Sequence, residues 1–554
     1  MNSYSFWLAR STASKWFYTV VGALFFWLAF PPLDFTALIF VFLVPILLIE
    51  DELFYSPAAE SSRKLWWWSM AQFLLLNSLT LWWIKNAAWV GAIASVLANT
   101  LLMSLVVYLY HRMRRSSGDR YAAFGLISLW MGYEFLHYSW DLDFPWLTLG
   151  NSFANHPSWI QWYDKTGVFG GSLWVLVVNL SLFYGLKNLL LRSNPQLDGD
   201  EKRYLGWNSA RYFSRAFFLL LLPLVASWMI WSNYQPKGVK AEVAVVQPNF
   251  DPYNSKFDEN LYQNQLDTLL SLTDKAMTPE TRLVLWPETS IPGSIWLKEG
   301  DQNWQQASIR HFLSNYEGPA LLVGASAVTS FQQGEKLPEY TRPHPAGGYY
   351  LPHNSALFYR NGHEPQVYHK SQLVIGVEKM PYPQVLGFLG KLSVDLGGMT
   401  GTLGKQKERA VFENAGIKVA PVICYESVFG GYVTEYMRKG ANLIGIITND
   451  GWWGNTDGYR QHLAFARLRA IENRRDVARS ANTGISAFIN QRGELLGKTG
   501  WWEQGTLTAE VYLNEELSFY SRYGDYLGRT AAFLAILLVL IHWSKSRSKK
   551  GKIR

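Results

Sequence analysis

The pattern of apolar and polar positions divides the chain into two kinds of sequence. Seven stretches before residue 235, and an eighth near the C-terminus, are apolar enough and about long enough to cross a bilayer, which takes about 20 residues of helix. Between them, short β-rich runs alternate with stretches of helical periodicity, as in a soluble α/β domain. The apolar stretches centre on residues 20–30, 37–48, 67–83, 91–108, 122–135, 171–190, 217–231 and 526–543.

The central block predicts strands that are covered on both faces. Near-continuously apolar runs such as residues 443–447 are typical of strands buried between two layers. We therefore expect an α/β sandwich of roughly one large domain, interrupted by a long polar loop over residues 329–353. Strands are expected at 241–246, 282–286, 320–324, 355–359, 417–424, 443–448 and 485–490, and helices at 258–275, 303–314, 432–439 and 459–474.

Charge adds an orientation to this pattern. The mean hydropathy of −0.04 averages two unlike parts, and the basic residues gather on alternate connections between the apolar stretches. By the positive-inside rule, both termini are expected in the cytoplasm and the central block on the far side of the membrane. These flanks explain the net charge of +8, so no nucleic-acid partner is expected. The expected domains are a membrane domain (1–237), a catalytic domain (238–513) and a C-terminal helix with a basic tail (514–554).

The candidate chemistry starts from the one cysteine of the chain. Cys424 ends an apolar run and is followed by Tyr425 and Glu426. A lone thiol is usually a buried and inert side chain. Two other short stretches, however, also end in an ionisable residue, Glu288 and Lys370. Taken singly these are a surface carboxylate and a snorkelling lysine, but together the three supply a base, an oxyanion stabiliser and a nucleophile.

The order Glu, Lys, Cys resembles the catalytic set of the nitrilase superfamily. Its place between a bundle of apolar stretches and one last stretch resembles the apolipoprotein N-acyltransferases. The chain departs from the common pattern of that family at Ile375-Gly376-Val377-Glu378 and at Trp452-Trp453-Gly454. The matching segments are Glu134-Phe135-Leu136, Phe144-Pro145-Trp146-Leu147, Leu285-Trp286-Pro287-Glu288, Tyr368-His369-Lys370, Ile423-Cys424-Tyr425-Glu426, Thr448-Asn449-Asp450-Gly451-Trp452-Trp453-Gly454 with Gln461-His462, and Arg479-Ser480-Ala481-Asn482-Thr483-Gly484-Ile485-Ser486.

The resemblance implies a multi-span membrane bundle of about eight helices that carries an extracytoplasmic nitrilase-like αββα domain. It places the protein in the bacterial inner membrane with the catalytic domain in the periplasm. The implied reaction moves an acyl chain from a glycerophospholipid, through a thioester on Cys424, to the α-amine of a diacylglyceryl-cysteine on an apolipoprotein. Glu288 is then the base and Lys370 stabilises the oxyanion. A monomer without cofactor is expected, and no metal, because His462 has no second ligand at metal spacing.

Further residues take supporting places in this interpretation. Glu378 is expected to hold Lys370 or the acceptor amine, and Glu426, with Tyr425, to orient the loop after the nucleophile. Solvated or ion-paired carboxylates are the alternative. Aromatic residues at a bilayer interface are also simple anchors, and Asn449 also suits a turn cap. The residues expected to line a lipid path are Trp146, Trp231, Asn449, Trp452 and Trp453.

Two other functions remain open from the sequence. A membrane-tethered amidase of the nitrilase type explains Glu288, Lys370 and Cys424, but one anchor would suffice for it, and seven preceding apolar stretches would have no task. A catalytically silent protein that binds lipoproteins would not need the three residues, and all three are present.

Overall fold

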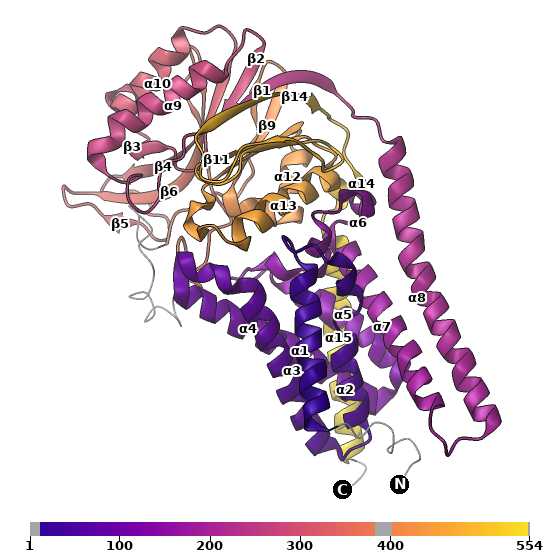
Figure 1. The fold of residues 1–554 in the computed structure, drawn as a ribbon. Coiled ribbons are helices and arrows are strands. Elements are labelled where there is room, and N and C mark those ends of the chain that lie inside the picture. The colour runs from indigo at the N-terminus through magenta and orange to yellow at the C-terminus, as the bar shows by residue number, and fades with distance from the viewer. Residues whose placement is uncertain (1–10, 383–401, 552–554) are drawn as a thin grey trace. The chain divides into compact units, whose positions relative to one another are not determined.

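The computed structural model describes residues 11–382 and 402–551, and the chain divides into two compact units. The helical unit comprises Met1–Trp82, Ala92–Ser232 and Asp525–Arg554. The sandwich unit comprises Trp83–Gly91 and Asn233–Gly524. All strands among the described residues belong to the sandwich unit, shown in pink, orange and gold in Figure 1.

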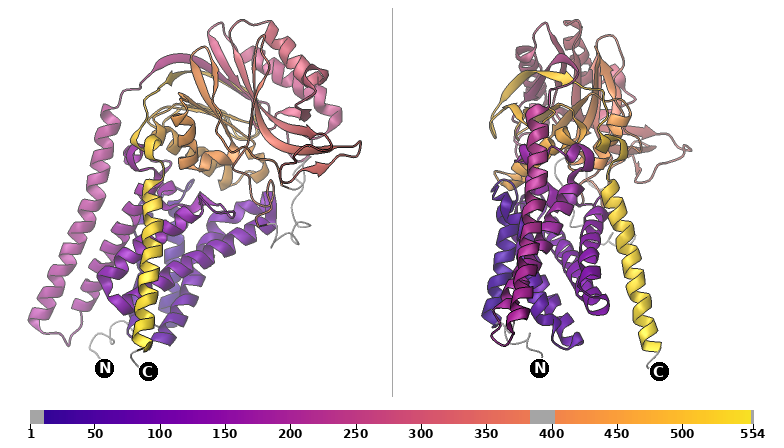
Figure 2. Two further views of the ribbon diagram at one scale, coloured as in Figure 1. Left: turned by 180° about the vertical axis from the view of Figure 1, so that it is seen from behind. Right: turned by 90° about the vertical axis from the view of Figure 1, so that its right-hand side faces the viewer.

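Each of the eight apolar stretches lies on helical structure, as predicted. α15, drawn in yellow in Figure 2, packs against α5, and α8 runs along the flank of the helical unit. A Cβ at Gly132 of α5 would lie 3.1 Å from the Cβ of Ala535, so the small residue lets α5 and α15 approach closely. The helices are α1 (Thr12–Ala29), α2 (Val44–Phe54), α3 (Ala58–Leu81), α4 (Lys85–Ser117), α5 (Asp119–Leu136), α6 (Tyr163–Thr166), α7 (Val168–Arg192), α8 (Gly199–Asn233) and α15 (Tyr526–Gly551), with 3₁₀ turns η1 (Thr36–Phe40), η2 (Trp82–Ile84), η3 (Pro145–Leu147), η4 (Leu149–Phe153) and η5 (Pro157–Trp159).

Four helical segments of the described chain are long and apolar enough to cross a membrane by length and composition. The first of them runs through α3, η2 and α4 and has a kink at Ala88 inside α4. The stretch at residues 37–48 departs from its expected length, because it forms η1 and the 11-residue α2, which is too short to span a bilayer. The four segments are Ala58–Ser117, Val168–Arg192, Gly199–Asn233 and Tyr526–Lys545.

Buried polar side chains hold the turns between these helices. Asn179 of α7 accepts from the main-chain N of Leu43 (3.0 Å) and donates to the carbonyl oxygen of Ile39 (2.9 Å). Glu134 of α5 accepts from the main-chain N of Leu149 (2.8 Å). A buried main-chain group without a partner costs about 1–3 kcal/mol, so these contacts stabilise the non-helical turns that an apolar pattern alone does not explain.

The sandwich unit contains two sheets that carry helices on their outer faces (Figure 1). The first sheet has the order β14-β1-β2-β4-β6-β5, with β3 paired to β4 and β7 to β6; the second has the order β13-β12-β11-β10-β9-β8. Neighbours β1, β2 and β4 are parallel, as are β9, β10 and β11. The strands are β1 (Val239–Gln247), β2 (Thr281–Leu285), β3 (Ile291–Trp296), β4 (Ala320–Phe331), β5 (Arg342–Pro343), β6 (Tyr349–Arg360), β7 (Gln366–His369), β8 (Phe412–Asn414), β9 (Ile417–Ile423), β10 (Leu443–Thr448), β11 (Val477–Ala481), β12 (Ala487–Ile489), β13 (Leu495–Lys498) and β14 (Gly505–Leu513).

All seven expected strands and all four expected helices of this block are present, and the expected α/β sandwich is confirmed. The predicted loop over residues 329–353 is partly wrong, because β4 continues to Phe331 and pairs with β6 from Tyr349, so both ends of that segment form a hairpin. The helices are α9 (Tyr262–Ala276), α10 (Trp304–Ser314), α12 (Gly430–Arg438), α13 (Asp457–Asn473) and α14 (Phe519–Tyr523), with η6 (Glu259–Leu261), η7 (Gly300–Gln302), η9 (Cys424–Val428) and η10 (Asp450–Trp453).

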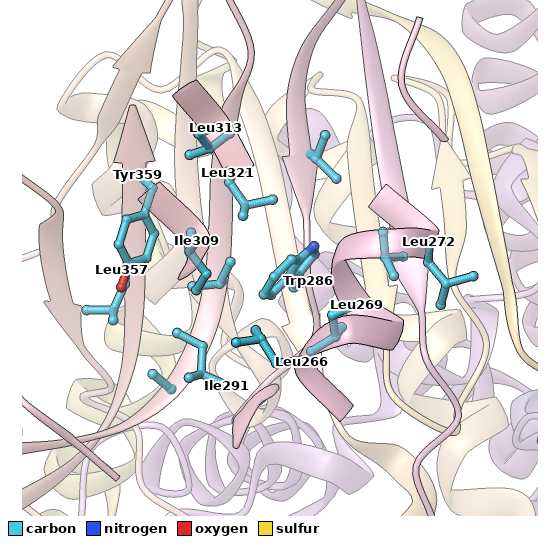
Figure 3. Close-up of a cluster of buried hydrophobic side chains, with 14 of the residues drawn as sticks. Leu266, Leu269, Leu272, Trp286, Ile291, Ile309, Leu313, Leu321, Leu357 and Tyr359 are labelled. Carbon is cyan, nitrogen blue, oxygen red and sulfur yellow. The ribbon is translucent and has the colours of Figure 1, made fainter. Parts of the chain in front are cut away.

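A buried apolar cluster joins the first sheet to α9 and α10 (Figure 3). Trp286, fully buried directly after β2, packs among Leu266 and Leu269 of α9 and Leu321 of β4. Its indole N–H donates to the hydroxyl of Thr273 (2.7 Å). At about 25 cal/mol per Å², an aromatic side chain of this size stabilises the fold by about 4–6 kcal/mol. The packing of Trp286 therefore fixes the chain two residues before Glu288.

Candidate active site

Strand ends bring the three predicted catalytic residues together. Glu288 follows β2, Lys370 follows β7 and Cys424 follows β9. β2 and β7 belong to the first sheet and β9 to the second, so strand ends of both sheets contribute to the site. The Nζ of Lys370 lies 3.0 Å from Oε1 of Glu288, and the Cys424 thiol is close enough to the same carboxylate for each to shift the pKa of the other. All three are buried, with exposed fractions of 6%, 1% and 8%.

A glycine makes room for this turn. Pro287 and Glu288 cross directly over β4, where a Cβ at Gly324 would lie 2.5 Å from the Cα of Glu288. The main-chain N of Gly324 donates to the carbonyl oxygen of Pro287 (3.1 Å). Any larger residue at position 324 would push the Glu288 backbone away from the sheet, so the glycine is required by the close approach.

Lys370 lies between two carboxylates. Its Nζ is 2.9 Å from Oε1 of Glu378, in addition to its contact with Glu288. Asn354 of β6 donates through Nδ2 to Oε1 of Glu288 (2.7 Å) and to Oε1 of Glu378 (2.8 Å). The amide and the ammonium thus hold both carboxylates, and Glu378 occupies the place beside Lys370 that the sequence predicts for it.

The electrostatics of this cluster favour an ionised base and an un-ionised thiol. Burial favours the neutral form of Glu288, but Lys370 and the hydrogen bonds to the carboxylate outweigh it and hold the pKa of Glu288 below its usual value. Burial also opposes the charge on Lys370, but Glu288 and Glu378 raise the pKa of Lys370 well above its usual range. For Cys424, burial and the charge of Glu288 raise the pKa of the thiol well above its usual value.

The predicted nucleophile has an unusual backbone conformation. Cys424 has φ +49°, in the left-handed region that non-glycine residues rarely adopt. This turn separates β9 from the 3₁₀ helix Cys424–Val428 and directs the side chain at the end of the strand. Backbone strain of this kind costs about 1–3 kcal/mol and persists only where the surrounding contacts fix it.

Glu426 supplies those contacts. One carboxylate oxygen accepts from the main-chain N of Ile423 (2.9 Å), and the other accepts from the main-chain N of Ser371 (2.7 Å) and the hydroxyl groups of Tyr368 and Tyr432. The fully buried Glu426 side chain therefore joins the segment around Cys424 to the segment around Lys370. Burial raises the pKa of Glu426. Tyr425 is buried beside it and packs edge-on against Phe429.

A second polar cluster contacts the main chain of Cys424. His462 of α13 contacts the carbonyl oxygen of Cys424 (Nε2 to O, 3.2 Å) and the hydroxyl of Ser427 (2.8 Å). Its Nδ1 lies 2.9 Å from Oδ1 of Asp450, whose other oxygen accepts from Arg479 of β11. All four side chains are buried. The cluster fixes the main-chain carbonyl of Cys424.

Sequence reasoning missed three features of this site. Asn354 fell between the predicted loop (329–353) and the predicted strand (355–359), and the hydrogen-bonded set of Asp450, His462 and Arg479 is spread over three elements. Lys256 is also buried, and its Nζ donates to the carbonyl oxygen of Glu288 (3.2 Å) and the hydroxyl of Thr289 (2.8 Å). Burial lowers the pKa of Lys256 to about 8, although Glu288 and Cys424 oppose this. No local signal distinguishes this lysine from a surface one.

The five expected lipid-path residues fall into two groups. In the sandwich unit, the main-chain N of Asn449 donates to Oε2 of Glu288 (3.1 Å), and Trp452 packs beside Tyr253. The half-buried Trp453 lies edge-on to His462 (5.5 Å between ring centres). The other two belong to the helical unit, where Trp146 is buried in η3 and Trp231 is half-buried on α8.

A metal centre has no donor set in the described chain. Among residues 11–382 and 402–551, no group of three or more His, Cys, Asp or Glu side chains is placed to hold a metal ion. The cluster instead combines a thiol, carboxylates and two ammonium groups. This arrangement suits acyl transfer through a covalent thioester.

Two family models match this chain. Residues 242–517 match the carbon-nitrogen hydrolase family, and residues 22–181 match the apolipoprotein N-acyltransferase N-terminal domain. An amidase from Nesterenkonia sp. of known structure is 19% identical, with a TM-score of 0.36, over 54% of this chain and 99% of that one.

Two relatives match across both units. The apolipoprotein N-acyltransferase of Geobacter metallireducens is 28% identical over 80% of this chain and 78% of its own length. That of Chlorobaculum tepidum is 30% identical over 96% of this chain and 97% of its own length. With both family models matched in order and a relative aligned over nearly its whole length, the chain belongs to the apolipoprotein N-acyltransferase family.

Proposed function

We propose that this protein transfers an acyl chain from a membrane glycerophospholipid to the α-amine of the N-terminal diacylglyceryl-cysteine of apolipoproteins, through a thioester on Cys424. The observation that carries the proposal is the buried cluster of Glu288, Lys370 and Cys424, in which Lys370 pairs with Glu288 and the same carboxylate influences the charge of the Cys424 thiol. The family relationship supports the two lipidic substrates.

In the first half-reaction, Glu288 takes the proton of the Cys424 thiol while the sulfur attacks the ester carbonyl of the phospholipid. Lys370, with main-chain N–H groups near Cys424, stabilises the tetrahedral oxyanion. The ester C–O bond then breaks, and Glu288 returns the proton to the departing glycerol oxygen. The products are an acyl thioester and a lysophospholipid. The high pKa of the resting thiol does not prevent attack, because Glu288 removes the proton as the sulfur attacks.

In the second half-reaction, the α-amine of the diacylglyceryl-cysteine attacks the thioester carbonyl. Glu288 takes a proton from the nitrogen and delivers it to the departing sulfur. An amide forms, the C–S bond breaks and the thiol is regenerated. Glu378 and Asn354 fix Lys370 and Glu288 through both steps, because each contacts the cluster directly.

The proposal includes a membrane arrangement. We propose a membrane domain over residues 1–237, a catalytic domain over 238–513 and a C-terminal helix with a basic tail over 514–554. The protein acts as a monomer in the bacterial inner membrane, with the catalytic domain in the periplasm and both termini in the cytoplasm. The basic residues on alternate connections support this orientation.

The decisive experiment traps the acyl-enzyme. Purified protein incubated with labelled phospholipid alone should gain one acyl chain, and the label should leave when a diacylated lipopeptide with a free α-amine is added. An N-acetylated lipopeptide should not discharge it, because an amide nitrogen is a poor nucleophile. Double-reciprocal plots should give parallel lines, since the donor product leaves before the acceptor binds.

Three results would contradict the proposal. Intersecting lines without a trappable acyl-enzyme indicate direct transfer in a ternary complex. Turnover of small amides by water, without acylation by phospholipid, indicates an amidase. Absence of any adduct and any turnover indicates a binding protein. Glu288→Gln should prevent thioester formation, and Glu280→Gln, an exposed carboxylate in the same unit, is the matched control.

A further inference from the structure

The helical unit contains a basic cavity remote in sequence from the candidate active site. It has a volume of about 570 Å³ and is lined by α5, α7 and α8. α7 and α8 run side by side and are joined by a short connection (Figure 1). Cavities of about 300–1,000 Å³ are typical of small-molecule sites. Both charged and apolar side chains line it.

Charged side chains line the cavity at the start of α5, near the end of α7 and along α8. Four basic side chains and one carboxylate line it. No carboxylate among the described residues forms an ion pair with Arg120, Arg211 or Arg215. Lys187, by contrast, pairs with Asp51 (2.8 Å) and Asp119 (3.5 Å). The lining charges are Asp119, Arg120, Lys187, Arg211 and Arg215.

A buried ion network neutralises the one carboxylate. Asp119 accepts from Nε of Arg114 (2.8 Å), and the same guanidinium binds Glu50 and Asp51 (2.5 Å each). The network has three carboxylates (Glu50, Asp51 and Asp119) and two basic side chains (Arg114 and Lys187), so Lys187 adds no excess positive charge to the cavity. Arg120, Arg211 and Arg215 leave an excess of positive charge that faces the cavity and solvent.

The walls of the cavity are tied to one another. Tyr184 of α7 donates through its hydroxyl to the carbonyl oxygen of Asp119 at the start of α5 (3.3 Å). Its ring stacks on that of Tyr212 of α8, with 5.3 Å between ring centres. Ser209 of α8 donates to the carbonyl oxygen of Gly185 (2.9 Å). Direct contacts between α5, α7 and α8 thus form the walls of the cavity.

The other end of the cavity is apolar. Phe124 and Ile127 on α5, and Val177 and Leu180 on α7, line it about one and a half to three turns from Asp119 and Lys187. A small soluble anion makes no favourable contact with such an apolar wall, whereas the acyl chain of an amphiphile does. Long arginine side chains on α8 lie where they can reach the polar end while their stems cover apolar surface.

We propose that this cavity binds an anionic phospholipid of the membrane, with its phosphate between the arginines and the start of one acyl chain along the apolar wall. The site is separate from the proposed acyl-transfer function and does not depend on it. By the charge pattern of the chain, it belongs to the cytoplasmic leaflet, which carries the charged ends of α7 and α8.

The test measures lipid retention by the full-length protein in detergent, using native mass spectrometry. The probe is phosphatidylglycerol, compared with phosphatidylcholine of the same chains. The double variant Arg211→Gln/Arg215→Gln should bind phosphatidylglycerol roughly 30-fold more weakly, since each basic residue contributes about one factor of five. Arg203→Gln is the matched control, because Arg203 is an exposed arginine on the same helix that lies outside the cavity lining.

Several outcomes decide the proposal. Preferential retention of phosphatidylglycerol by the wild type and the Arg203→Gln control, with loss in the double variant, supports it. Equal retention by all three proteins overturns it. Displacement of the lipid by excess inorganic phosphate also overturns it, since the site would then be a free-anion site. Lipid held at the catalytic site is common to all three proteins, so the difference between them isolates the cavity. Equal unfolding temperatures without added lipid show that the variants fold.

Discussion

At the scale of single residues, burial and neighbouring charges decide which groups of the site are ionised. Lys370 has a well-defined cationic state because two carboxylates face it, whereas Cys424 keeps its proton because burial and Glu288 disfavour the thiolate. The base, not the resting thiol, is the ionised group. A nucleophile generated only during attack explains how a buried thiol next to a carboxylate can still react.

The strain at Cys424 gives a first prediction about stability. Glycine adopts the left-handed conformation at little energetic cost, whereas alanine does not. We expect Cys424→Gly to be more stable to unfolding than Cys424→Ala by about 1 kcal/mol, the reverse of the usual order. Denaturant unfolding of both variants measures the difference, and neither should form a thioester. A less stable glycine variant would mean that this turn is unstrained.

Lys256 gives a prediction about pH. Its pKa is about 8 in the folded protein, against about 10.4 in an unfolded chain. Between these values the folded state binds fewer protons, so the contribution of Lys256 to stability rises with pH. Its positive charge beside Cys424, however, is lost over the same range. We expect thioester formation to slow as pH rises through about 8.

Two lysine variants separate this effect from other titrations. Lys256→Met should lack the decrease in rate near pH 8, and Lys336→Met, which changes an exposed lysine of the same unit, should keep it. Rates of single-turnover acylation between pH 6 and 10 provide the measurement. Identical profiles for Lys256→Met and the wild type would show that the ammonium of Lys256 has no influence on the thiol.

At the scale of elements, Glu426 joins two segments that are far apart in sequence. Removing it leaves the N–H groups of Ile423 and Ser371, and the tyrosine hydroxyls, without their acceptor. We expect Glu426→Ala to lower the free energy of unfolding by about 3–5 kcal/mol and to slow acylation at temperatures where the variant is still folded. Glu435→Ala breaks only a half-exposed contact with Arg409 and should cost less than about 1 kcal/mol. Equal stability of the two variants would remove Glu426 from this role.

The elements also show how far sequence reasoning extends. The apolar pattern was sufficient to predict the strands that lead to Glu288 and Cys424, because these strands consist almost entirely of apolar residues. It failed for β11, a central strand that carries Arg479 and Ser480. Arg479 is tolerated there because it binds Asp450, and that partner lies on another element. The contacts of Asn354 and Lys256 were hidden for the same reason: each depends on tertiary neighbours.

At the scale of the whole molecule, orientation in the membrane is the open prediction with the largest consequence. In sealed spheroplasts, a tag after Arg554 should be protected from external protease, while sites in the polar hairpin over residues 332–348 should be cut. Permeabilised cells, in which both are cut, are the control. The reverse pattern would place Cys424 in the cytoplasm and end the proposal that it acts on exported lipoproteins.

The single cysteine has one more consequence, which concerns chemical durability. Oxidants such as peroxide attack thiolates, and the sulfenic acid that forms is normally rescued by a second thiol. This chain has no second thiol, so damage at Cys424 could not be repaired from within the molecule. Burial, which raises the pKa of the Cys424 thiol, keeps it protonated at rest and so slow to oxidise. The same proton that the proposed mechanism removes in every cycle protects the sulfur between cycles.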